Sequence, residues 1–352
     1  MTAQGRHIPE RIGAERIGAE RHGAGAASAV TRTAPRAHQA GETMAVTVGA
    51  VILSVRGADP VVAVVPAPRA GEEQLPCGPF SPGEHRTLEA GVRAWAQAQT
   101  GVEARFLQQL CTLADGVGPD PVQPTLCVSY LALVSPRQCS DRTQAAWRSW
   151  YAFFPWEDWR YGRPGCLDDL YARLEAWAAQ PAPPCAARGP ADRSQRLRMA
   201  FGGANGGGWD EERVLERWEL LAEAGLAGPA ALQAGTRRSL PRLTHPVLGD
   251  QTAVLARAVG ELRRTVKYRP VVFELMPDEF TLFELQKTVE AILGPNLHKQ
   301  NFRRLIEGCG LVEPTGEQRL RTGGRPARLY RFRRSVIYER AAPGVKVKPG
   351  RA

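Results

Sequence analysis

The run that decides the fold reads Thr281-Leu-Phe-Glu-Leu-Gln-Lys-Thr-Val-Glu-Ala-Ile-Leu293, followed by Gly294-Pro-Asn296. Thr281 and Glu284 have the spacing of a capping box, in which each side chain satisfies a backbone N–H at the start of a helix. Apolar residues then recur at helical spacing up to Leu293. Gly294 begins a tight turn, and Asn296 is expected to be the N-cap of the next helix. The sequence therefore predicts a helix over 282–293, a turn and a second helix over 297–308.

The second helix is amphipathic, and a basic hairpin follows it. Phe302, Leu305 and Ile306 share one face, and a polar face lies opposite. Residues 311–313 and 327–332 read as two strands joined by a glycine-rich loop. This order is that of a winged helix-turn-helix, and the residues expected to contact DNA are Lys299, Gln300, Arg303, Arg304, Arg319, Arg321, Arg325 and Arg328.

The charge distribution agrees with a polyanionic partner for the C-terminal part. Residues 236–352 contain 23 Lys and Arg against 11 Asp and Glu, whereas the net charge of the whole chain is +10. A basic segment attached to a mildly acidic one favours a nucleic acid that contacts the basic segment. A solvated basic surface, or a winged helix that contacts proteins, would leave the same pattern.

The remaining chain divides into four further parts. Residues 1–43 are rich in small residues and are expected to be a disordered tail, with Met44 as the expected true start. Residues 44–179 alternate between strand and helix patterns, which predicts an α+β domain. Residues 180–249 contain Pro/Ala-rich and Gly-rich stretches and read as a linker with short helices. The winged helix is expected over 250–340, and a basic tail over 341–352.

Composition excludes several other classes of protein. The longest apolar run, residues 46–55, is about half the length of a membrane span. The seven cysteines are scattered and include no Cys-x-x-Cys pair, which argues against a zinc site or a disulfide framework. No metal site and no cofactor are expected, and the chain is expected to be cytoplasmic.

A resemblance to a known family then follows from specific motifs. Phe273-Glu-Leu-Met-Pro-Asp-Glu-Phe280, Asn301-Phe-Arg-Arg304, Leu311-Val-Glu-Pro-Thr-Gly316 and Gly324-Arg-Pro-Ala-Arg-Leu-Tyr-Arg-Phe332 resemble the Nudix-related transcriptional regulators of bacterial NAD metabolism. That family joins a Nudix-like α/β/α domain to a C-terminal winged helix. In the N-terminal part, Leu75-Pro-Cys-Gly78 with Pro82-Gly-Glu84, and Thr100-Gly-Val102, resemble the two ends of a Nudix box.

The box lacks the residues that catalysis requires. A Nudix hydrolase holds divalent metal with a glutamate cluster on the box helix, since hard oxygen ligands bind the ion that activates water. Counted back from Gly101, the glutamate positions are occupied by Trp95, Ala98 and Gln99. We therefore expect no enzymatic activity; the alternative is a pyrophosphohydrolase of the ADP-ribose class with a displaced metal site.

The resemblance implies a homodimeric repressor of NAD-biosynthesis genes. Its partners would be a double-stranded DNA operator and an NAD-related nucleotide effector, namely ADP-ribose, NAD or ATP. The effector-binding residues are not predicted. Aromatic residues at 147–159 are compatible with stacking on an adenine, but at that spacing they favour a domain core.

Overall fold

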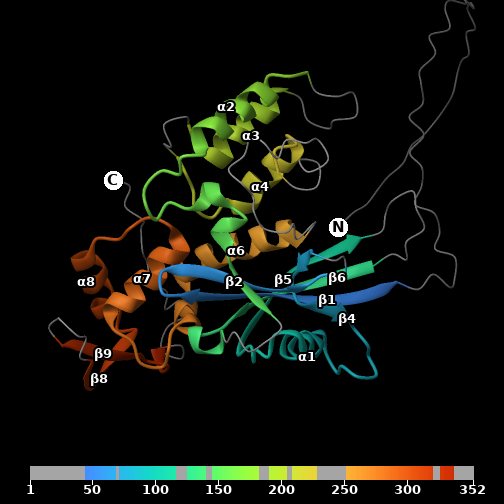
Figure 1. The fold of residues 1–352 in the computed structure, drawn as a ribbon. Coiled ribbons are helices and arrows are strands. Elements are labelled where there is room, and N and C mark those ends of the chain that lie inside the picture. The colour runs from blue at the N-terminus through green and yellow to red at the C-terminus, as the bar shows by residue number, and fades with distance from the viewer. Residues whose placement is uncertain are drawn as a thin grey trace, which may run out of the picture. The chain divides into compact units, whose positions relative to one another are not determined.

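The computed structural model describes residues 44–68, 71–115, 125–139, 145–181, 190–203, 208–227, 251–319 and 326–336. A mixed sheet lies at its centre (Figure 1). The strands are β1 (Ala45–Arg56), β2 (Asp59–Pro66), β3 (Glu73–Gln74), β4 (Cys77–Pro79), β5 (Phe106–Asp115), β6 (Thr125–Leu133) and β7 (Ala146–Ser149). The main path is β3-β2-β1-β6-β5, while β4 also pairs with β1 and β7 with β2. The β1–β6 pair is parallel and the other pairs are antiparallel.

Strand β1 shows why both faces of the sheet are covered. Its side chains alternate, so that Val48, Ala50 and Ile52 join one buried apolar cluster and Val51 and Leu53 join another. Helix α1 (Leu88–Thr100) covers the first face, with Val92 and Ala96 in that cluster. Helix α6 (Gln251–Tyr268) packs on the second face against β5 and β1, as Figure 1 shows.

Three more helices lie beyond α6: α2 (Leu167–Ala178), α3 (Pro190–Phe201) and α4 (Val214–Glu223). Helices α3 and α4 fall in the segment expected to be a linker with short helices. Their buried residues, including Leu197 and Leu221, belong to the same apolar cluster as α6. This part of the segment therefore packs into the core, because it supplies apolar faces that a solvated linker lacks.

The aromatic stretch after β7 is also core. It forms the short 3-10 helices η2 (Trp150–Ala152) and η3 (Pro155–Glu157), and Trp150, Tyr151 and Trp156 are buried. Phe154 packs edge-on against Trp156 and Trp218 at ring separations of 6.1 and 6.2 Å. The buried aromatic residues of this stretch therefore belong to the domain core, as their spacing predicts.

The C-terminal part forms a winged helix-turn-helix. The 3-10 helix η5 (Pro270–Leu275) precedes α7 (Leu282–Leu293), α8 (Lys299–Cys309), β8 (Val312–Arg319) and β9 (Ala327–Phe332). Phe280 forms a short antiparallel bridge with Tyr330, so the segment before α7 is tied to the wing. The predicted capping box is present: the Thr281 hydroxyl accepts from the Glu284 N–H, and the Glu284 carboxylate accepts from the Thr281 N–H.

The start of α8 differs from the prediction. The helix begins at Lys299 with His298 at the N-cap, and Asn296 does not cap it. Asn296 donates from Nδ2 to the Arg160 carbonyl oxygen at 3.2 Å. Its side chain is therefore used in a contact with a segment more than a hundred residues away, which a local pattern does not reveal.

No helix in the described ranges has both the length and the apolar character needed to cross a membrane.

Candidate nucleic-acid interface

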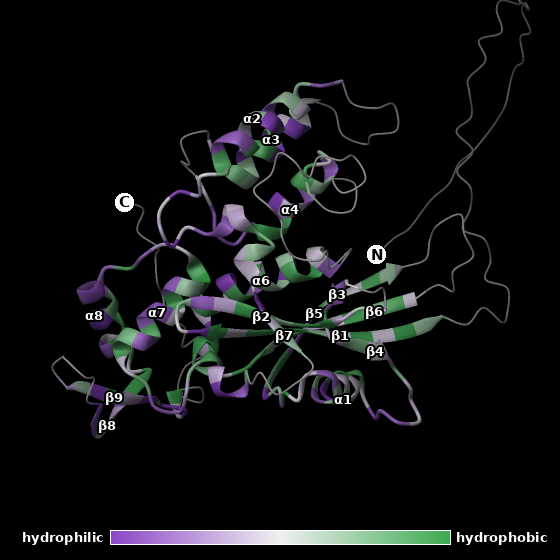
Figure 2. Cartoon of the chain, viewed as in Figure 1, coloured by the Kyte–Doolittle hydropathy of each residue, from purple (hydrophilic) through white to green (hydrophobic). Residues whose placement is uncertain are grey.

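A groove of about 580 Å³ lies between α8, the N-terminal end of α7 and strand β9. Three of the predicted DNA-contacting residues line it together: Lys299 and Arg303 from α8, and Arg328 from β9. Figure 2 shows α8, β8 and β9 as largely hydrophilic, in contrast to the sheet strands. Because a helix and a wing flank the groove, its cations converge from two elements separated in the sequence.

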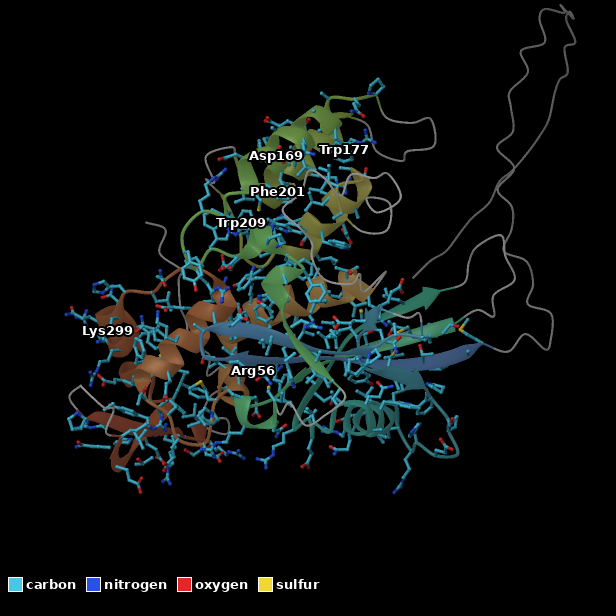
Figure 3. The ribbon with its side chains drawn as sticks, in the orientation of Figure 1. Arg56, Asp169, Trp177, Phe201, Trp209 and Lys299 are labelled. Atoms are coloured by element: carbon cyan, nitrogen blue, oxygen red, sulfur yellow. The ribbon has the colours of Figure 1, made fainter. Side chains whose placement is uncertain are left out.

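The exposed face of α8 carries the other predicted readers. Gln300 and Arg304 are exposed, while Phe302 and Ile306 are buried on the opposite side of the helix. Lys299 projects from α8 in Figure 3. Arg303 pairs with Glu307 one turn later, with Nε and Oε1 3.1 Å apart, and this bond raises the pKa of its guanidinium. In the described part of the chain Lys299, Arg304 and Arg328 make no ion pair, so their charge is not locally neutralised.

The wing residues have different surroundings. Arg319 donates to Glu284 at 2.7 Å, which joins β8 to the first turn of α7 and occupies one end of its guanidinium. Arg328 is exposed on β9. Arg321 and Arg325, also predicted to contact DNA, lie outside the described residues. The groove thus contains Arg328, and Arg319 lies beside α7 in an ion pair.

The groove contains residues that the sequence did not single out. Phe283, 47% exposed, lies on its rim near the Lys287 ammonium, which is 5.7 Å from the ring centroid. Gln318 from β8 also lines it. Phe283 is exposed although it lies two residues after the N-cap Thr281, and the helical pattern alone did not separate it from the buried apolar residues around it.

Helix α1 carries the three residues at the positions where the sequence comparison expects the glutamates of a Nudix box. Trp95 donates from its indole N–H to the Pro79 carbonyl oxygen at 3.0 Å. Gln99 accepts from the Cys77 N–H at 3.0 Å and donates to the Cys77 carbonyl oxygen at 2.9 Å. Ala98 is exposed. Trp95 and Gln99 therefore hold strand β4 against α1 through their side chains.

The remaining carboxylates of the box do not form a metal site. Glu89 pairs with Arg93 at 2.7 Å, and Glu84 is exposed in the turn before α1. Within the described ranges, no three His, Cys, Asp or Glu side chains are grouped so that they could hold a metal ion. The residues present therefore do not fit the divalent cation that Nudix hydrolysis needs.

Comparisons with known proteins identify the C-terminal part. Residues 272–332 match the family model described as the NrtR DNA-binding winged helix domain. A curated relative, the ADPR responsive transcriptional repressor NtrR of Acinetobacter baylyi, is 43% identical over 83 residues, 24% of this chain and 33% of the relative. The chain therefore spans about a third of the length of the curated relative that it matches.

Similar solved structures include three of the Shewanella oneidensis NrtR protein. NrtR complexed with a 27mer DNA aligns with 83% of this chain and 95% of its own, at 20% identity and a TM-score of 0.50. The NUDIX domain of that protein, complexed with ADP ribose, aligns with 32% of this chain and 77% of its own, at 23% identity and a TM-score of 0.28.

These matches confirm the resemblance and the predicted fold class. The chain has an α+β fold in which a Nudix-like α/β/α sheet region precedes a winged helix-turn-helix. The curated relative is named as a regulator.

Proposed function

We propose that the chain is a DNA-binding transcriptional repressor of NAD-biosynthesis genes, which senses an NAD-related nucleotide through a non-catalytic Nudix-like domain. The observation that carries the proposal is the groove in which Lys299, Arg303 and Arg328 converge within a winged helix. Lys299 and Arg328, which make no ion pair within the described residues, are suited to phosphates, because neutralising a phosphate releases its condensed counterions. The match of residues 272–332 to a DNA-binding domain supports the same role.

The proposed roles divide between the helix and the wing. Lys299, Gln300, Arg303 and Arg304 lie on the face of α8 that would enter the major groove, where Arg and Gln side chains read base edges. Arg328, with Arg321 and Arg325 of the wing, would contact the backbone, which positions the protein without reading sequence. Arg319 is assigned to the same wing surface, with its Glu284 ion pair aligning it.

The test compares specific and random DNA. Arg304→Ala should weaken binding to the chain's own operator by about tenfold or more, and binding to random duplex far less, because a base contact contributes about 1–3 kcal/mol. Arg173→Ala, on α2 in an ion pair with Asp169, is the matched control and should change neither affinity. Equal losses on both DNAs for Arg304→Ala would contradict its role in base reading.

The proposed effector is ADP-ribose, with NAD and ATP as the competing nucleotides. The curated relative is named for its response to ADPR, and that property is carried to this chain as part of the proposal. A sensing domain that binds a nucleotide without hydrolysing it must bind it more tightly in one DNA-binding state than in the other. Titration of the operator complex with each nucleotide in turn identifies the effector.

Non-catalytic sensing is proposed from the contacts of α1. Trp95 and Gln99 are used to hold β4, and Ala98 has no carboxylate. Incubation with ADP-ribose and Mg²⁺ or Mn²⁺ should therefore release no AMP. AMP release above the rate of a heat-inactivated sample would support the alternative, a pyrophosphohydrolase with a displaced metal site.

The remaining parts of the proposal concern organisation. The domain boundaries are proposed as a tail over 1–43, a sensor over 44–179, a winged helix over 250–340 and a basic tail over 341–352. The connecting segment over 180–249 is proposed as a linker with short helices, of which α3 and α4 pack into the core. The chain is proposed to act as a cytoplasmic homodimer, because helix-turn-helix proteins commonly read paired half-sites. Sedimentation of the chain on a two-half-site duplex tests this: two copies per duplex are expected.

A further inference from the structure

The turn of the helix-turn-helix lies directly against a segment that follows the sheet. Gly294 has a φ of +98°, and a Cβ at this position would be 3.2 Å from the Trp159 Cβ. Asn296 donates to the Arg160 carbonyl oxygen at 3.2 Å. The φ of Gly294 favours glycine, and a side chain at this position would crowd Trp159. Residues 157–160 are therefore in contact with the turn that places α8.

The turn is fixed to α7 from its other side. Gln286 donates to the Leu297 carbonyl oxygen at 2.8 Å, and the Glu290 carboxylate accepts from the Leu297 N–H at 2.9 Å. Gln286 and Glu290 are only 6% and 4% exposed, and they are also bonded to each other. Because both backbone groups of Leu297 are held by α7, a displacement of α7 is passed to the start of α8.

The segment 157–160 is anchored by a buried ionic cluster. The Glu157 carboxylate lies 2.6 Å from Arg217 Nε of α4 and 2.7 Å from Arg263 Nη1 of α6, and all three side chains are at most 1% exposed. Arg217 also lies over the ring of Trp209 (labelled in Figure 3), 3.9 Å from the centroid. Buried charges of this kind require complete pairing and hold one arrangement of the groups around them.

The same cluster holds the end of α7. The last carbonyl groups of a helix have no partners within it. Arg263 donates to the Ile292 carbonyl oxygen at 2.8 Å, and the Tyr151 hydroxyl donates to that of Ala291 at 2.9 Å. Tyr151 lies in η2, which follows β7 directly. The last turn of α7 is thus held by side chains from α6 and from the end of the sheet.

Two further contacts connect this region to the sheet. Arg160 donates to Asp59 Oδ1 at 3.1 Å, at the start of β2, and to the carbonyl oxygen of Ala58 at 2.7 Å, in the turn before it. At the other end of α6, Gln251 accepts from the Leu75 N–H at 2.7 Å, two residues before the Cys77 that Gln99 holds. Helix α6, about 27 Å long at 18 residues, therefore connects the segment between β3 and β4 to α7.

We propose that Tyr151, residues 157–160 and Arg263 form a coupling junction, through which effector binding at the sheet changes the placement of the turn at 294–298 and hence of α8. This inference rests on the proposed function, since it assigns a route to the regulation proposed there. It requires the junction to hold different arrangements in the DNA-binding and effector-bound states, and so to affect the coupling free energy between the two sites.

The test measures the ratio of operator Kd values with and without saturating ADP-ribose, on the full chain. Tyr151→Phe keeps the ring and removes the bond to Ala291, so it should reduce this ratio by about fivefold, the equivalent of one hydrogen bond. Asn296→Ala should reduce it by about twofold. Tyr268→Phe is the matched control at an exposed tyrosine, 58% accessible, and should leave the ratio unchanged. If neither Tyr151→Phe nor Asn296→Ala changes the ratio of Kd values, the inference is overturned.

Hydrogen exchange separates this inference from the proposed function. Tyr151→Phe should speed amide exchange at residues 291–297 by about fivefold, with exchange in β1 unchanged. A wild-type chain that shows no operator preference, or no response to ADP-ribose, would contradict the proposed function. In that case the amide exchange rates of Tyr151→Phe alone test the coupling junction. If amide exchange at 291–297 in Tyr151→Phe is as slow as in the wild-type chain, the inference of a coupling junction is overturned.

Discussion

The Glu157→Gln substitution tests whether the buried ionic cluster stabilises the chain. Glu157 is fully buried and accepts from Arg217 at 2.6 and 3.0 Å and from Arg263 at 2.7 Å. The amide keeps the shape of the side chain but removes its charge and presents an NH₂ group to a guanidinium. Two guanidiniums then remain buried without a carboxylate.

The expected loss is about 3–5 kcal/mol of unfolding free energy, the range for a buried ion pair broken by removing one partner. That is a large part of the roughly 5–15 kcal/mol that stabilises a typical protein. With a urea m value of about 3 kcal/mol/M, the midpoint should fall by roughly 1–2 M.

The assay is urea unfolding followed by tryptophan fluorescence. Glu89→Gln is the matched control, because Glu89 makes an exposed ion pair with Arg93 at 2.7 Å, and pairs of this kind contribute about 0.3–0.5 kcal/mol. Its midpoint should change little. If Glu157→Gln shifts the midpoint no more than Glu89→Gln does, the cluster does not stabilise the fold as argued.

Three further predictions concern the box, the α3–α4 region and the wing. A Cβ on Gly78 would lie 2.2 Å from the Trp95 ring, so Gly78→Ala should lower the unfolding free energy by about 1–3 kcal/mol and lower Tm. Gly83→Ala, in open space, is the control and should leave Tm unchanged. Equal Tm values for the two variants would contradict the packing of Trp95 on Gly78. Burial raises the pKa of Asp210, but the bonds from the Glu212 N–H and Arg213 outweigh it and hold this pKa below its usual value. Its stabilising effect is therefore complete above the unfolded pKa and is lost as pH falls, so the Tm difference between wild type and Asp210→Asn should shrink from about pH 6 toward pH 3; a constant difference would refute this. Arg328→Ala should weaken operator and random DNA alike and reduce the salt slope of log Kd by about 1, and an unchanged slope would remove Arg328 from the phosphate contacts.

Local patterns predicted the elements whose causes are local. The capping box at Thr281, the helix ending at Leu293 and the return strand at 327–332 all occur where the sequence indicates them. These features depend on neighbours within four residues along a helix or on a strand alternation, so a single segment contains the information.

Features with distant causes were not predicted. Glu157 bonds to partners 60 and 106 residues away, and no spacing rule connects them. Asn296 was expected to cap α8, but its side chain is used by Arg160, 136 residues away. The ion pair between Arg319 and Glu284 joins residues 35 positions apart, and no spacing rule connects these two either.

The box illustrates both cases. Counting back from Gly101 predicts Trp95, Ala98 and Gln99 at the glutamate positions, and this prediction needs only the local sequence. The contacts of Trp95 and Gln99 could not be predicted from the sequence, because their partners lie in β4 and the contacts depend on the packing of α1 on that strand.

The most direct test of the account is fluorescence anisotropy at physiological salt, with a duplex from the upstream region of an NAD-biosynthesis gene and a scrambled duplex of the same composition. The account predicts binding to the native duplex at least about a hundredfold tighter than to the scrambled one. It also predicts that ADP-ribose shifts the native curve. Weak and equal binding to both duplexes, unchanged by ADP-ribose, NAD or ATP across several such upstream regions, would contradict it.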